Sequence, residues 1–302
     1  MSNLNSSHAF PAFAVALIVA SGFSLAGMDA LAKLLAINAP VIMVLWGRYF
    51  FHTAITFVAY GAKTRSLGFL RARRPGLQLL RAGALFGATF FLYQAVTRMP
   101  LGDAAAIQFL APVLVTAFSG LLLGEQVGPR RWAAVACGFV GVLLVARPGS
   151  GVFGWVALLP LATAVLLAIY MIMTRIIRTR DNPAATTFYS TAVGALVLSA
   201  LVPFVWQDLT AWQWALMVAM GAAGALGHFM LVKAFHSAEA SALAPFTYSH
   251  VVAAIIWGYL LFGDVPSGWT FAGAGLVIAS GLYVWYRETR VARPPVESAE
   301  SR

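Results

Sequence analysis

The chain has 302 residues, of which 61% are hydrophobic and only 10% are charged. A soluble domain carries about a quarter charged residues, so this composition excludes a water-soluble globular protein. The net charge of +10 is of the size seen in nucleic-acid-binding proteins. The positions of the basic residues nevertheless argue against that function, as described below.

Apolar segments of membrane length recur along the chain and predict an all-α polytopic membrane protein. With about 20 residues per span, ten helices and short loops use nearly the whole chain and leave no room for a soluble catalytic domain. The first segment has no basic start or small-residue cleavage site, so we interpret it as a span and not a signal peptide. The predicted helices are 11–37, 41–61, 77–98, 102–123, 130–146, 155–177, 186–206, 212–236, 241–262 and 269–286.

Basic residues gather in alternate loops, at 63–74, 130–131, 175–180 and 287–302. The positive-inside rule then places both termini in the cytoplasm and the chain in the inner (plasma) membrane. Arg81 falls at a cytoplasmic helix end. The basic charge is explained by this topology, so the expected partners are the lipid bilayer and a small solute, and no nucleic acid. Residues 1–10 and 288–302 are predicted cytoplasmic tails, and the assembly is a monomer or a homodimer.

Residues 83–146 align with residues 222–285 without a gap, at a shift of 139 positions. The alignment brings Gly124-Glu125 onto Gly263-Asp264 and Leu121-Leu122 onto Leu260-Leu261. Each copy contains five predicted helices, so the second copy must be inserted upside down relative to the first. Inverted repeats of this kind are typical of secondary transporters.

Four local patterns make the chain similar to the drug/metabolite transporter superfamily, in its ten-helix EamA-type branch. The resemblance implies two inverted five-helix repeats at 11–147 and 154–287, a central cavity between them, and movement of small organic solutes. It implies no particular cargo. The patterns are Met28-Asp29-Ala30-Leu31-Ala32-Lys33 with Pro40 and Gly47-Arg48-Tyr49; Met99 to Ala106 running through Phe109 to Val113 and Leu123-Gly124-Glu125; Ala168-Ile169-Tyr170 with Arg175; and Ala242 to Pro245 with Leu261-Phe262-Gly263-Asp264.

Ionisable residues inside a span are costly, so they are candidate functional residues. The first two helices form a hairpin that turns near Asn38, and Asp29 and Arg48 lie at equal distances from the turn, at about 14 Å for a rise of 1.5 Å per residue. Lys33 shares a helix face with Asp29 but lies nearer the outer rim. One reading is a purely structural Asp29–Arg48 pair. The other is that one acid facing two bases leaves positive charge for a substrate carboxylate or phosphate.

Pro112 lies about ten residues into the fourth helix, near the membrane midplane. A proline inside a helix removes a backbone hydrogen bond, and transporter sites are built at such discontinuities. We therefore expect Pro112 to form a hinge or a cavity wall. Pro245, in contrast, is expected in the first turn of the ninth helix, where proline is well tolerated. Weaker candidates for substrate binding or coupling are Gln94, Gln108, Tyr170, His228, Tyr248 and His250.

Glu125 and Asp264 follow the C-terminal ends of their helices, where a carboxylate opposes the helix dipole. Each is therefore expected to have a cationic partner. We interpret the two as structural loop locks first and as gates second, on opposite faces of the membrane.

The sequence has no phosphate-binding loop for an ATP-driven pump and no zinc-protease motif, and it predicts neither a metal nor a cofactor. The function favoured is a secondary carrier that moves a small organic metabolite by alternating access. An amino-acid-like, zwitterionic or anionic substrate and efflux are favoured. Two alternatives stay open, an intramembrane lipid-modifying enzyme in which Asp29, His228 and His250 converge, and an uptake carrier for a vitamin-like or nucleoside-like solute.

Overall fold

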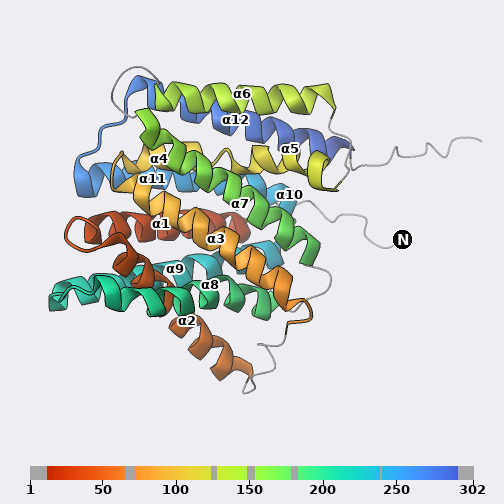
Figure 1. Ribbon diagram of the computed structural model, residues 1–302. Coiled ribbons are helices and arrows are strands. Elements are labelled where there is room, and N and C mark those ends of the chain that lie inside the picture. The colour runs from red at the N-terminus through yellow and green to blue at the C-terminus, as the bar shows by residue number, and fades with distance from the viewer. Residues whose placement is uncertain are drawn as a thin grey trace, which may run out of the picture.

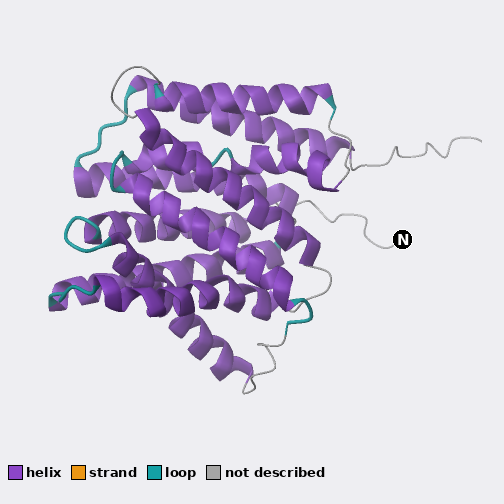
Figure 2. Cartoon of the chain, viewed as in Figure 1, coloured by secondary structure: helices purple, strands orange, loops and turns teal. Residues whose placement is uncertain are grey.

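The computed structural model describes residues 12–64, 72–123, 128–147, 154–177, 183–238 and 240–291, and within these ranges the chain contains helices and loops but no strand (Figure 2). The α-helices are α1 (Ala12–Leu35), α2 (Val41–Thr64), α3 (Pro75–Val96), α4 (Leu101–Gln108), α5 (Ala111–Leu123), α6 (Pro129–Ala146), α7 (Leu158–Ile177), α8 (Pro183–Leu201), α9 (Ala211–Ser237), α10 (Ala240–Leu243), α11 (Ser249–Phe262) and α12 (Gly268–Val291). Short 3₁₀ segments at Gly154–Ala157, Val202–Val205 and Ala244–Tyr248 precede or follow them.

Ten segments of the described chain are long and apolar enough to cross a membrane. They correspond one for one to the predicted helices. The ends differ by a few residues, because helix ends fray and loop polarity marks them only loosely. The prediction of ten spans in an all-α protein is therefore confirmed.

Two predicted helices are interrupted, and the sequence analysis had treated both as continuous. The predicted helix 102–123 divides into α4 and α5 at Phe109–Leu110, and the predicted helix 241–262 divides into α10, a 3₁₀ segment and α11. The shift of 139 positions carries Phe109 onto Tyr248, so the two interruptions fall at equivalent places. The rings of these two residues also lie against each other, with centroids 5.5 Å apart.

Most helix pairs join the first five spans to the last five. When the spans are numbered one to five within each half of the chain, the same pairings recur in both directions. The first helix of one half packs on the third helix of the other, giving α1 against α9 and α3 against α7, while α6 packs on α12 and α2 on α8 (Figure 1). Hydrogen bonds also join these pairs of helices. The Ser21 hydroxyl of α1 donates to the Gly227 carbonyl of α9 at 2.8 Å, and the Thr163 hydroxyl of α7 donates to the Ala88 carbonyl of α3 at 3.1 Å. The two acceptors, Ala88 and Gly227, correspond under the shift of 139 positions.

Small residues allow the helices that carry the site to approach closely. A side chain at Gly22 of α1 would collide with Ser249 and with the backbone of His250 in α11. The Trp257 indole N–H donates to the Phe23 carbonyl at 3.1 Å and ties the same two helices together. This contact positions the first turn of α11 directly beside the middle of α1.

Candidate functional site

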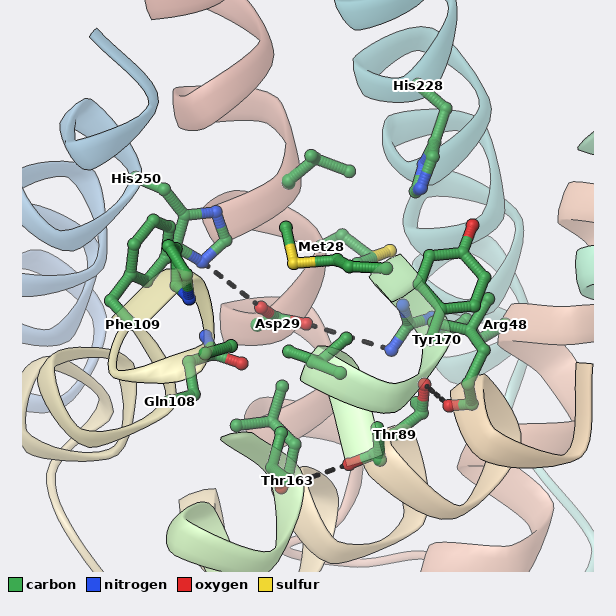
Figure 3. A pocket seen from close by; sticks show the side chains of 18 residues that line it. Met28, Asp29, Arg48, Thr89, Gln108, Phe109, Thr163, Tyr170, His228 and His250 are labelled. Carbon is green, nitrogen blue, oxygen red and sulfur yellow. Dashed lines mark hydrogen bonds and ion pairs between the residues drawn. The ribbon is translucent and has the colours of Figure 1, made fainter. Parts of the chain in front are cut away.

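A cavity of about 260 Å³ lies in the middle of the bundle. Residues from α1, α2, α3, α7, α9 and α11 form its wall together with the interruption between α4 and α5, as Figure 3 shows. The wall contains six of the predicted binding residues and the predicted hinge. These are Asp29, Arg48, Gln108, Tyr170, His228, His250 and Pro112.

Asp29 lies between Arg48 and His250, at ion-pair distance from both but beyond hydrogen-bond distance from either (Figure 3). Its Oδ1 is 3.9 Å from Arg48 Nη1, and its Oδ2 is 3.6 Å from His250 Nε2. Among the described residues, Asp29 Oδ1, Arg48 Nη1 and His250 Nε2 are buried without a hydrogen-bond partner. The predicted equal depth of Asp29 and Arg48 is confirmed. His250 also approaches this carboxylate, and His228 lines the same cavity, so the three residues that the sequence suggested could converge do lie around one cavity.

Buried polar atoms in proteins are nearly always hydrogen-bonded, and leaving one unpaired costs free energy. Three such atoms facing one cavity therefore form a site that is incomplete without a further group. A molecule with both a donor and an acceptor fits this arrangement, because the carboxylate accepts hydrogen bonds and the guanidinium donates them.

Aromatic rings surround the guanidinium of Arg48. Its Cζ lies 5.1 Å from the Tyr93 ring centroid and 5.7 Å from that of Tyr49. The Tyr49 hydroxyl donates to Thr89 Oγ1 at 3.0 Å, which fixes the ring. Sequence reasoning missed Thr89 and Tyr93, because a threonine and a tyrosine within an apolar helix carry no signal until their neighbours are known.

His228 lines the cavity from α9, where its Nδ1 contacts the Gly224 carbonyl at 2.9 Å. Its ring lies 5.1 Å from the ring of His52, a residue of α2 that is 3% exposed. His52 is not among the residues predicted from the sequence, although it lies one helical turn after Arg48. The small residues Gly221 and Gly224 allow α2 to approach α9 at this point, since a side chain at either would meet Phe51 or His52.

The interruption of the fourth span brings an aromatic side chain to the cavity. Pro112 has no N–H to donate to the Gln108 carbonyl, so the helix ends at Gln108 and resumes at Ala111. The break therefore lies one turn before the proline, and Pro112 itself belongs to the first turn of α5. Phe109, at the break, packs 5.3 Å from the His250 ring and forms part of the wall. The signal in the sequence is its position three residues before Pro112, where a helix break is expected.

Tyr170 of α7 forms part of the cavity wall, and the guanidinium of Arg81 lies against its ring. The Cζ of Arg81 lies 4.8 Å from its ring centroid, and Arg81 is only 1% exposed. Arg81 lies in the second turn of α3, close to the helix end at which the sequence places it, and its side chain turns inward between α3, α7 and α8. Neutral hydroxyl, amide and carbonyl groups hold it there.

Three predicted residues lie outside the cavity wall. Tyr248 is 7% exposed and packs against Phe109, and a side chain at Gly281 would overlap its hydroxyl. Gln94 accepts a hydrogen bond from Arg98 Nη1 at the end of α3. Lys33 contacts Asp264 and does not line the cavity. Glu125, which aligns with Asp264 in the repeat, lies outside the described residues.

Lys33 and Asp264 form an ion pair at the rim of the bundle, with Nζ and Oδ2 2.8 Å apart. Lys33 Nζ also donates to the Met99 carbonyl at 3.3 Å and lies 4.5 Å from the Phe262 ring centroid. Gly263 ends α11 in the left-handed conformation, with φ of 68°, and so turns Asp264 back towards the helix end. The predicted cationic partner of Asp264 is thus Lys33.

A helical membrane bundle that encloses a charged cavity at its centre is the architecture expected of a membrane carrier for small solutes. The model of the EamA-like transporter family matches residues 12–147 and again residues 154–286. Because these two matches cover most of the chain, the protein belongs to the EamA-like transporter family.

Curated relatives are similar along most of their length. The riboflavin transporter of Vibrio cholerae is 29% identical, over 80% of this chain and 82% of its own. The S-adenosylmethionine uptake transporter of Rickettsia conorii is 28% identical, over 89% and 91%. The pseudopaline exporter of Pseudomonas aeruginosa is 28% identical, over 88% and 93%. A crystal structure that is 20% identical superposes with a TM-score of 0.61, over 92% of this chain and 98% of its own, which supports the fold alone.

Proposed function

We propose that this protein is a secondary carrier that binds a small zwitterionic or anionic metabolite, amino-acid-like in its charged groups, in the central cavity. The observation that carries the proposal is the set of three buried polar atoms without a hydrogen bond, on Asp29, Arg48 and His250, around one cavity. A substrate carboxylate would take the free Arg48 donor, and a substrate ammonium would take the free Asp29 oxygen. Each interaction removes an unsatisfied buried group, so binding is favoured by the relief of that penalty.

The aromatic rings at the cavity select the uncharged part of the substrate. Phe109 lies beside the Asp29–His250 group, and Tyr170 lies on the Arg48 side (Figure 3). Such rings provide a large apolar contact, and Tyr170 adds a hydroxyl. The cavity of about 260 Å³ is near the lower limit of ordinary ligand sites, which run from about 300 to 1,000 Å³. A compact metabolite is therefore favoured over a large one.

Alternating access is proposed from the relation between the two halves. The helix pairings that recur in both directions, the equivalent interruptions at Phe109 and Tyr248, and the hydrogen bonds of Ser21 and Thr163 to corresponding carbonyls support two similar halves. The two separate matches of the family model support the division at 147 and 154. Five spans in each half require opposite insertion, and two such halves can exchange conformations across the membrane. Pro112, next to one interruption, is proposed as a hinge.

The Lys33–Asp264 pair is proposed as a lock at one end of this path. It joins the end of α1 to the loop between α11 and α12, and Leu101 N–H at the start of α4 also approaches Asp264 Oδ2, at 3.4 Å. Opening that end requires these contacts to separate. The alignment of Glu125 with Asp264 predicts a corresponding lock at the opposite end, at Glu125, which lies outside the described residues.

The proposed orientation has both termini in the cytoplasm of an inner-membrane protein, and the proposed direction is efflux. Cysteine labelling tests the orientation, with Arg74→Cys and Asp208→Cys introduced separately after Cys137→Ala. An impermeant maleimide is expected to label Asp208→Cys and not Arg74→Cys in intact cells. The reverse pattern would overturn the orientation.

Ligand binding and transport test the function itself. A thermal-shift screen of the purified protein against amino acids and related metabolites is expected to find stabilising ligands, because a ligand that binds the native state raises its apparent stability. Proteoliposomes loaded with a stabilising ligand are then expected to exchange it for the same labelled solute outside. Binding without exchange, accompanied by chemical conversion of a lipid-linked substrate, would instead favour the lipid-modifying enzyme.

A vitamin-like or nucleoside-like solute is the second candidate, with uptake as its direction. The observation that favours it is the number of rings on the wall, because Phe109, Tyr170, His228 and His250 all line the cavity. Stacking between such rings suits a planar heterocycle. Riboflavin and adenosine belong in the same thermal-shift screen, and stabilisation by these compounds without stabilisation by amino acids would favour this candidate.

A further inference from the structure

Behind the Tyr170 wall lies a buried arginine that has no acidic partner among the described residues. Arg81 is 1% exposed, and among the described residues the structure records no carboxylate in contact with it. Its guanidinium is held by neutral groups of three helices. Nε donates to Gln78 Oε1 at 3.3 Å, Nη1 to Thr174 Oγ1 at 3.1 Å, and Nη2 to Ser190 Oγ at 2.6 Å and to the Thr186 carbonyl.

The cost of burying this cation requires an explanation. Burial of a charge in a low-dielectric interior is unfavourable, and a nearby opposite charge usually compensates it. The neutral acceptors around Arg81 satisfy its donors but leave its full positive charge in place. A leucine or methionine would fill the same space between α3, α7 and α8 without that cost. The charge itself is therefore the feature to be explained.

The guanidinium lies over the ring of Tyr170, at 4.8 Å from the ring centroid, and Tyr170 lines the cavity while Arg81 does not. A cation on one face of an aromatic ring engages the negative π density of that ring. The cavity side of Tyr170 is then a poorer site for a second cation and a better one for negative charge. Arg48, on the same side of the cavity, adds a second positive charge, whereas Asp29 lies between Arg48 and His250, 3.9 Å from the Arg48 guanidinium (Figure 3).

We propose that Arg81 is a specificity-determining residue, which gives the Tyr170 wall a positive potential and directs the anionic end of the substrate to it. The inference rests on the proposed function, since it assigns a role at the same cavity. The positive potential is then greatest at the Tyr170 wall, near Arg48 and Arg81, and it decreases through Asp29, which lies between Arg48 and His250, towards Phe109. A zwitterion binds in one orientation, and a purely cationic solute is rejected from the Tyr170 side.

Charged thiol reagents measure this potential without a known substrate. Leu85 lines the cavity one helical turn after Arg81 on α3, and Leu25 lines it from α1. Each is replaced by cysteine after Cys137→Ala, giving a near and a far reporter. The purified proteins are treated with sulfonatoethyl or trimethylammonioethyl methanethiosulfonate, and each rate is divided by the rate for free cysteine. The ratio of the anionic to the cationic rate reports the local potential.

The normalised ratio is expected to be higher at Leu85→Cys than at Leu25→Cys in the chain that retains Arg81. Arg81→Gln is expected to lower the ratio at Leu85→Cys about tenfold, as expected for loss of a unit charge within about 10 Å in a partly buried site. The same change is expected to alter the ratio at Leu25→Cys by less than about twofold, because the potential falls with distance. Arg81→Lys is expected to retain the high ratio, because it keeps the charge.

Ser190→Ala is the matched control, since it removes one Arg81 partner and disturbs the same packing but keeps the guanidinium. It is expected to leave both ratios unchanged. Equal ratios at the two reporters in the chain with Arg81 would overturn the proposal even if Arg81→Gln fails to fold. So would a Leu85→Cys thiol that neither reagent reaches. Failure of solute exchange in proteoliposomes would count against the proposed carrier. The reagent ratios would still test the role of Arg81, because they are measured without a substrate.

Discussion

Asp29 and Lys33 lie one helical turn apart on α1 and have opposite kinds of surroundings. Lys33 has a tight partner, Asp264, at 2.8 Å, together with a carbonyl and a ring. Asp29 has two candidate partners at 3.6 and 3.9 Å and an oxygen without a hydrogen bond. The rim pair is thus complete in itself, whereas the cavity group is complete only with a ligand. We therefore propose that the charged residues at the rim serve stability and that those in the cavity serve recognition.

The largest effect is expected at Asp29. Asp29→Asn leaves Arg48 without a counter-charge, and transport is expected to fall at least about tenfold, because an unpaired buried charge costs several kcal/mol. Exchange in proteoliposomes measures the loss. Asp208→Asn, the same change at an exposed acid, is the control and is expected to have no effect. If the pair is only structural, Asp29→Asn with Arg48→Gln restores folding and transport together. If Arg48 holds the substrate, the double variant folds but does not transport.

The rim pair is expected to affect stability more than binding. Asp264→Asn removes one member of a partly buried pair and is expected to lower the free energy of unfolding by about 1–3 kcal/mol. Thermal unfolding of the purified protein measures this, with Asp208→Asn again as the control. Lys33→Asp combined with Asp264→Lys is expected to recover most of the loss. A carrier whose ligand affinity falls while its unfolding temperature stays unchanged would place Lys33 and Asp264 in the binding site instead.

Two glutamines give an intermediate and sharper comparison. Gln108 lines the cavity, and Gln94 bonds Arg98 at a helix end. Gln108→Ala is expected to weaken ligand binding about fivefold, which corresponds to one ordinary hydrogen bond. Gln94→Ala is expected to change it by less than twofold. Thermal-shift titrations with one stabilising ligand compare the two variants. Equal effects would mean that the cavity wall does not define the binding site.

The smallest effect is expected at Pro112. Pro112→Ala restores the N–H that can bond the Gln108 carbonyl, so α4 and α5 are expected to join more easily. Exchange is expected to slow about threefold while folding is retained, since a hinge affects the conformational step and not the binding contacts. Hydrogen exchange at residues 108–112 provides the structural check. If amide exchange at these residues becomes slower while transport is unchanged, Pro112 is a structural kink only.

The sequence determined the membrane architecture and the depth of its charges. Hydrophobic length sets the number of spans, and the fixed rise of 1.5 Å per residue places Asp29 opposite Arg48 across a hairpin. The position of Asp264 at the C-terminal end of a predicted helix also identified it as a residue that needs a cationic partner. These properties follow from local chain geometry, so one sequence is sufficient to derive them.

Only the tertiary structure decided which charged groups share a site. His250 reaches Asp29 because small residues such as Gly22 let α11 approach α1, and Phe109 enters the wall because the helix breaks before Pro112. Arg81 turns inward behind Tyr170, whereas Lys33 turns to Asp264. The positive-inside rule and helix spacing fix depth along the membrane normal but not rotation about each helix axis. That rotation is set by contacts between helices far apart in the sequence, and it separates the rim pair from the cavity.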